Sequence, residues 1–168
     1  MGELKPIEEG FSPDGYIRDQ DCFSSLRYRT MPANVNGCGW IAAYNLRRFL
    51  GHDVSWDQVR QELDELHQLR LPGPTLVRVM RAYLSRTIPQ IQETVGREEA
   101  LAAAAQSRAG IFRYREGQVP HFISYLRQEN GMFRFFNVDD GLEDCCMSLE
   151  HFAREHLLGG TVIVFTVA

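Results

Sequence analysis

Hydrophobic and polar residues recur with different periods in the two halves of the chain. From about residue 38 to residue 107, apolar positions mostly recur every three or four residues, which is typical of amphipathic helices. After Gly110 they alternate or run together over short stretches bounded by turn residues, which is typical of strands. Helices followed by a mainly antiparallel sheet predict an α+β fold in two packed layers.

The pattern also predicts the individual elements. Ser55 begins a capping box, and Gly51 is a natural stop for the helix that precedes it. Residues 1–30 mix aromatic and turn residues, so we expect an irregular N-terminal arm packed on a single domain that spans residues 1–168. The expected helices cover about residues 38–50, 55–70, 75–85, 98–107 and 148–156, and the expected strands 88–94, 111–115, 121–127, 132–138 and 161–167.

The hairpin at Asn130-Gly131 has two possible registers. A two-residue loop, which Asn-Gly favours, pairs Glu129 with Met132 and turns Asn137 away from His121. A three-residue loop with Gly131 in the left-handed conformation brings Asn137 to the face of the sheet that carries His121. A site that uses both residues requires the second register.

Composition is that of an ordinary soluble domain, with 44% hydrophobic and 24% charged residues. A net charge of −4 without a basic run gives no reason to expect nucleic-acid or anionic-membrane partners. No apolar run approaches the ~20 residues of a membrane span, and no signal-peptide core is present. The four cysteines form neither a CxxC pair nor a disulfide framework, so a reducing cytoplasm is the expected location.

Cys38 is the strongest candidate for chemistry. It lies between Gly37 and Gly39 at the start of the first predicted helix. Unpaired backbone N–H groups and the helix dipole favour a thiolate there, which is the nucleophilic form of cysteine. The alternative is an inert cysteine buried in a glycine-rich turn, because free cysteine is among the most buried residue types.

A thiolate nucleophile needs a nearby base, and the base needs a group that orients it. Of the five histidines, only His121 opens a core-like strand. Asn137 ends the next strand, 16 residues later. The sequence therefore favours Cys38, His121 and Asn137 as one constellation.

These motifs resemble the papain-like cysteine peptidases. The closest likeness is to the small bacterial peptidases that remove double-glycine leader peptides, and to their stand-alone relatives, over about residues 30–168. The resemblance implies a papain-like α+β fold, in which an N-terminal helical part packs the nucleophile helix on a mainly antiparallel sheet. It also implies Cys38 as nucleophile, His121 as base and Asn137 as orienting residue. Because leader peptidases usually orient the histidine with aspartate, Asp139 is the alternative.

The chain departs from this family at the oxyanion hole. Such enzymes usually carry a glutamine six residues before the cysteine, and Pro32 stands there instead. Asn34 and Asn36 are the candidate side-chain donors beside the Cys38 backbone N–H. Of the two, we expect Asn34 to donate and Asn36 to cap the helix.

The resulting expectation is a cysteine peptidase or related thiol acyl-transfer enzyme that acts on peptide-like amide bonds of a peptide or protein substrate. We expect no cofactor, and no metal, because Cys145 and Cys146 with His151 and His156 lack the spacing of zinc ligands. The alternative is a catalytically silent papain-like domain that binds a peptide or protein partner.

Overall fold

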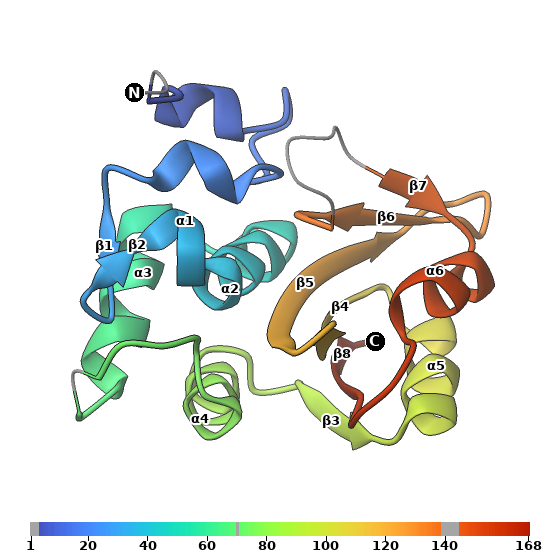
Figure 1. The fold of residues 1–168 in the computed structure, drawn as a ribbon. Coiled ribbons are helices and arrows are strands. Elements are labelled where there is room, and N and C mark those ends of the chain that lie inside the picture. The colour runs from blue at the N-terminus through green and yellow to red at the C-terminus, as the bar shows by residue number, and fades with distance from the viewer. Residues whose placement is uncertain (1–3, 70, 139–144) are drawn as a thin grey trace.

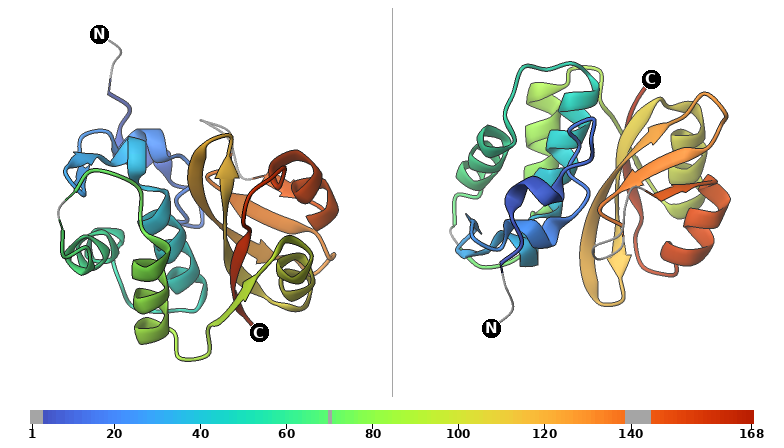
Figure 2. Two further views of the ribbon diagram at one scale, coloured as in Figure 1. Left: turned by 60° about the horizontal axis from the view of Figure 1, so that its bottom comes forward. Right: turned by 90° about the horizontal axis from the view of Figure 1, so that it is seen from above.

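A computed structural model describes residues 4–69, 71–138 and 145–168. Its main sheet has six antiparallel strands in the order β3-β8-β4-β5-β6-β7, with helices on both faces (Figures 1 and 2). The α+β fold is confirmed.

The strands are β1 (Arg27–Tyr28), β2 (Met31–Pro32), β3 (Gln92–Val95), β4 (Ala109–Glu116), β5 (Val119–Arg127), β6 (Phe133–Phe136), β7 (Cys145–Met147) and β8 (Ile163–Val167). The helices are α1 (Ala33–Asn36), α2 (Cys38–Phe49), α3 (Trp56–Leu66), α4 (Val77–Thr87), α5 (Arg97–Gln106) and α6 (Leu149–His156), with 3-10 turns η1 (Ile7–Gly10) and η2 (Gln20–Phe23).

Two hydrophobic cores lie on opposite faces of the sheet, so the expectation of two layers was wrong. One core contains α2, α3 and α4, and the other contains α5 and α6. Strand β5 contributes side chains to both cores, because Phe122 lies in the first core and Ile123 in the second. Strands that are apolar on both faces need a cover on each side, which makes a third layer.

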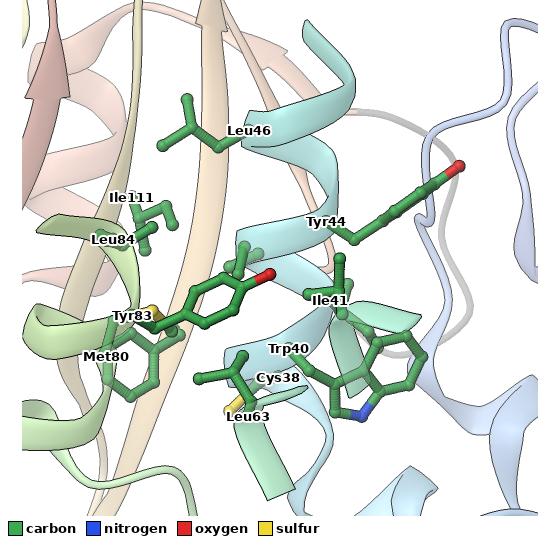
Figure 3. Close-up of a cluster of buried hydrophobic side chains, with 14 of the residues drawn as sticks. Cys38, Trp40, Ile41, Tyr44, Leu46, Leu63, Met80, Tyr83, Leu84 and Ile111 are labelled. Atoms are coloured by element: carbon green, nitrogen blue, oxygen red, sulfur yellow. The ribbon is translucent and has the colours of Figure 1, made fainter. Parts of the chain in front are cut away.

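Helix α2 runs through the first core. Its residues Cys38 to Leu46 are all buried, and they pack against side chains from α3, α4 and β4 (Figure 3). Gly51 follows the helix with φ 75°, a left-handed conformation that suits glycine and ends the helix as expected. The nucleophile candidate therefore stands at the end of a rigid, buried element.

Other elements differ from the sequence prediction mainly at their ends. Ser55 caps α3 by accepting from Gln58 N, as predicted, but the helix ends at Leu66 rather than near residue 70. Helix α4 and strand β3 begin later than predicted. The short helix α1 and strand β7 were not predicted, because elements of three or four residues are too short to show a period.

The β5–β6 hairpin takes the three-residue form. Gln128 N donates to Met132 O at 2.8 Å, and Gly131 has φ 81°. Phe133 and Phe135 consequently face the core that contains α5 and α6, with Arg134 on the opposite side. The register required to bring Asn137 beside His121 is confirmed.

The N-terminal arm is built into the first core. Ile17, Phe23 and Tyr28 have no exposed surface. Asn45 of α2 accepts from Ile17 N and donates to Ile17 O, each at 2.8 Å. The arm therefore has a defined position relative to α2, as expected of a packed segment.

Candidate active site

Cys38 is the first residue of α2 and is 4% exposed. It lies at one end of the buried cluster around the helix (Figure 3). Its sulfur shares a hydrogen bond with the side chain of His121, and backbone N–H groups of Phe122 and Gly39 also stabilise the thiolate. Gly37 is the N-cap residue, and no side chain of the described residues caps the helix start. The sulfur therefore lies among donors that favour its negative form.

His121 is held between two partners. Its Nε2 lies 2.9 Å from the backbone carbonyl oxygen of Asn137. A carbonyl only accepts, so Nε2 carries a proton and donates it. This leaves Nδ1 for the hydrogen bond with the Cys38 thiol. The ring of Tyr114 packs edge-on against the imidazole, with 5.7 Å between ring centroids.

The two groups shift each other's protonation in the same direction. Burial by itself would raise the pKa of Cys38, but the hydrogen bond and charge of His121 hold that pKa below its ordinary value. Burial by itself would lower the pKa of His121, but the hydrogen bond and charge of Cys38 raise it to about 9. Each group therefore favours the charged form of the other, a thiolate beside an imidazolium.

A second buried cysteine shows the opposite behaviour. Burial raises the pKa of Cys22 to about 11, and the neighbouring Asp19 adds to the effect. Burial beside a carboxylate therefore keeps the Cys22 thiol protonated, and the imidazole partner distinguishes Cys38 from Cys22.

Asn137 lies beside His121, but its side chain does not contact the imidazole as an orienting side chain would. Its amide forms two hydrogen bonds with Gln20 instead, and the backbone carbonyl holds the ring. Asn137 has φ 62°, which asparagine tolerates better than most residues. The predicted residue is thus at the site, with a different group directed at the histidine.

The two predicted oxyanion donors have different environments. Asn34 lines the cavity beside His121, and its amide oxygen is buried without a hydrogen-bond partner among the described residues. Asn36 does not fit the donor role, because its amide nitrogen already donates to Tyr28 O at 2.8 Å and Gly73 O at 2.9 Å. The expectation that Asn36 caps α2 was also wrong, since Gly37 is the N-cap residue and the Asn36 amide nitrogen donates to Tyr28 and Gly73 instead. Asp139, the alternative orienting residue, lies outside the described residues.

A cavity of about 350 Å³ opens at the histidine. Gln20 also belongs to the cavity wall, but the sequence gives no signal for it, because it carries no motif and lies in a segment predicted to be irregular. Cys38 itself is not part of the wall. The wall consists of His121, Asn137, Gln20 and Asn34, the carboxylates Asp19, Asp21 and Glu116, and the apolar Val35, Val119 and Val138.

The structure thus brings a cysteine at the start of a buried helix together with a histidine near the start of a strand. The fold itself is similar to the peptidase domain of Streptococcus ComA, a bi-functional ABC transporter involved in a quorum-sensing pathway. The TM-score is 0.54 at 14% identity, over 80% of this chain and 93% of that domain. The chain therefore has the papain-like α+β fold of a peptidase domain.

Comparison at the level of sequence adds nothing further. No protein-family model matches the chain, and no curated protein matches it. Within the described ranges, no three His, Cys, Asp or Glu side chains are grouped as metal ligands would be. In the same part of the chain, no helix combines the length and apolar composition that a membrane span requires.

Proposed function

We propose that this protein is a cysteine peptidase, or a related thiol acyl-transfer enzyme, that acts on peptide-like amide bonds. The observation that carries the proposal is the Cys38–His121 pair, in which a buried thiol and an imidazole at the cavity wall each favour the charged form of the other. The likeness to a peptidase domain supports a peptide or protein substrate. The finer resemblance to double-glycine leader peptidases remains part of this proposal.

In the proposed reaction, the Cys38 thiolate attacks the carbonyl carbon of the amide bond. The carbonyl oxygen becomes an oxyanion, which the Cys38 backbone N–H and the Asn34 amide stabilise. The imidazolium of His121 gives its Nδ1 proton to the departing amine as the C–N bond breaks, which leaves a thioester on Cys38. Water then attacks the thioester while His121 takes its proton, and the acid product leaves the regenerated thiolate.

The carbonyl of Asn137 has a defined part in this cycle. It accepts the Nε2 proton of His121 at 2.9 Å, so the imidazole can exchange a proton only through Nδ1, on the side of the thiol. The same hydrogen bond fixes the plane of the ring. Asn137 therefore orients the base through its backbone.

A catalytically silent binding domain is the second candidate, and one observation favours it. Cys38 is 4% exposed and does not line the cavity, so a substrate carbonyl reaches the sulfur only if the neighbouring side chains move. The presence of Pro32 in place of the usual glutamine also favours a catalytically silent domain. A peptide would then occupy the cavity without reacting.

Alkylation of the intact protein with iodoacetamide, mapped by mass spectrometry from about pH 5 to pH 10, separates the two functions. The enzyme proposal requires Cys38 to react on the acid side of ~8.5, the ordinary thiol pKa, and His121→Gln to abolish that reactivity. Cys22 is the internal control, because its pKa of about 11 keeps it unreactive over most of the range. A Cys38 that reacts no faster than Cys22 would leave the binding domain as the better interpretation.

A further inference from the structure

We propose that Gln20 of the N-terminal arm is a positioning residue, which holds Asn137 so that its carbonyl keeps the imidazole of His121 in place. This inference rests on the proposed function. The N-terminal arm lies before Cys38 in the sequence, and this inference gives it a role in the active site.

The evidence is a set of three hydrogen bonds centred on Gln20. Its backbone N donates to Asn137 Oδ1 at 3.1 Å, and its Oε1 accepts from Asn137 Nδ2 at 3.0 Å. Its Nε2 donates to the backbone oxygen of Asn34 at 2.7 Å. Both ends of the Asn137 amide and both ends of the Gln20 amide are therefore engaged. One side chain joins the segment before Cys38 to the segment after β6.

Asn137 needs such support because of its backbone. A non-glycine residue at φ 62° is in a sparsely populated conformation, which persists where the surroundings hold it. The reciprocal amide pair with Gln20 is the contact that fixes the side chain of Asn137. Without it, Asn137 can relax, and its carbonyl is no longer held at 2.9 Å from His121 Nε2.

Gln20 is itself well anchored. It begins η2, where the Asp19 side chain accepts from Asp21 N as an N-cap. The next residues, Cys22 and Phe23, are 1% and 0% exposed. Because the Gln20 amide nitrogen is committed to the Asn34 carbonyl, Gln20 supports the site rather than donating to an oxyanion.

Several charged groups near His121 could also affect a pH measurement. Cys38 faces the ring from α2, and Glu116 of β4 adds a smaller effect on its pKa. Asp19 and Asp21 belong to the wall of the same cavity. Removal of the uncharged Gln20 leaves these charges unchanged, so a shift in the titration of Cys38 would report the position of the imidazole.

The test compares Gln20→Ala, Asn137→Gly and the double variant by the pH profile of iodoacetamide alkylation at Cys38. We expect each single variant to raise the apparent pKa of Cys38 by about one unit. At pH values below that pKa, alkylation should then be about tenfold slower than in wild type. The double variant should match the single ones, because both residues act through one contact. Gln61→Ala is the matched control, since it removes an amide that bonds Asp57 at 2.7 Å on the exposed face of α3. It should leave the profile unchanged.

The outcomes separate this inference from the proposed function. A wild-type Cys38 without a lowered pKa would overturn the proposed function, and the role of Gln20 with it. A lowered pKa that survives Gln20→Ala would overturn the positioning role alone, as would additive effects in the double variant. Thermal melting checks that each variant is folded. If Gln20→Ala does not fold, Asn137→Gly still decides the question, because it removes the same contact and leaves the arm intact.

Discussion

The Nε2 atom of His121 lies 2.9 Å from the backbone carbonyl oxygen of Asn137, while the Asn137 side chain is bonded to Gln20. The group that orients the imidazole is therefore part of the main chain. The Asn137 side chain therefore acts on the histidine only indirectly, through its hydrogen bonds with Gln20. The side chain matters because it fixes the backbone of Asn137.

Activity on a peptide substrate should follow a bell-shaped pH profile. The thiolate–imidazolium pair exists at pH values above the lowered pKa of Cys38 and below the raised pKa of His121. We therefore expect the acid limb to lie below the ordinary thiol pKa and the alkaline limb near pH 9. The rate of acylation under single-turnover conditions measures both limbs. An alkaline limb near ~6.5, the ordinary histidine pKa, would contradict the ion pair.

Asn34→Ala and Asn36→Ala should have different effects. Asn34→Ala should slow acylation by about 10²-fold or more without changing stability, because it removes an oxyanion donor. Asn36→Ala should lower the free energy of unfolding by about 2–3 kcal/mol, because the buried Tyr28 carbonyl and the half-buried Gly73 carbonyl lose their donor. Acylation rates and urea denaturation measure the two effects. Full activity in Asn34→Ala would assign the oxyanion to other groups.

Gly39→Ala should damage both stability and the site. A Cβ at residue 39 would overlap the Thr75 hydroxyl, which is 2.7 Å from the Tyr28 hydroxyl. We expect the free energy of unfolding to fall by about 1–3 kcal/mol, as in other overpacked cores, and Cys38 alkylation to slow as α2 shifts. Gly159→Ala is the control, because no atom of the described residues lies within 4 Å of a Cβ there. Equal stability of the two variants would contradict the close packing at Gly39.

Asp14→Asn should loosen the arm in a pH-dependent way. Asp14 accepts from both Arg134 amino groups, at 2.6 and 2.9 Å, and this contact lowers the pKa of its carboxyl. A lowered pKa stabilises the fold above ~3.9, the ordinary aspartate value, and that stability is lost as the pH falls further. Because half of the Asp14 side chain is exposed, we expect a loss of at most about 1 kcal/mol at neutral pH.

Urea denaturation at neutral and acid pH checks this prediction. The difference between Asp14→Asn and wild type should disappear in acid. Glu155→Gln is the matched control, because its ion pair with Arg154 is exposed on both sides and should contribute nothing measurable. A difference that persists in acid would assign the effect to packing.

Local signals in the sequence predicted much of the fold near the site. The boundaries of α2, the cap at Ser55 and the strands β4, β5 and β8 depend on periodicity, capping and turn residues, which act over a few positions. The same is true of Cys38 and His121, because each is placed at the start of such an element. Their chemistry follows from residue type and position along the chain.

Tertiary structure decided what these signals left open. Asn130-Gly131 by itself favours the two-residue loop, but a slip of one residue would turn Arg134 toward the core of α5 and α6 and remove Phe133 and Phe135 from it. Burial of the strand therefore selected the register that brings Asn137 to His121. Gln20 and Asn137 are 117 residues apart, and no periodicity or motif couples residues at that distance. The sequence by itself determined which groups are available for chemistry, whereas packing of the arm against the sheet determined which of them are in contact.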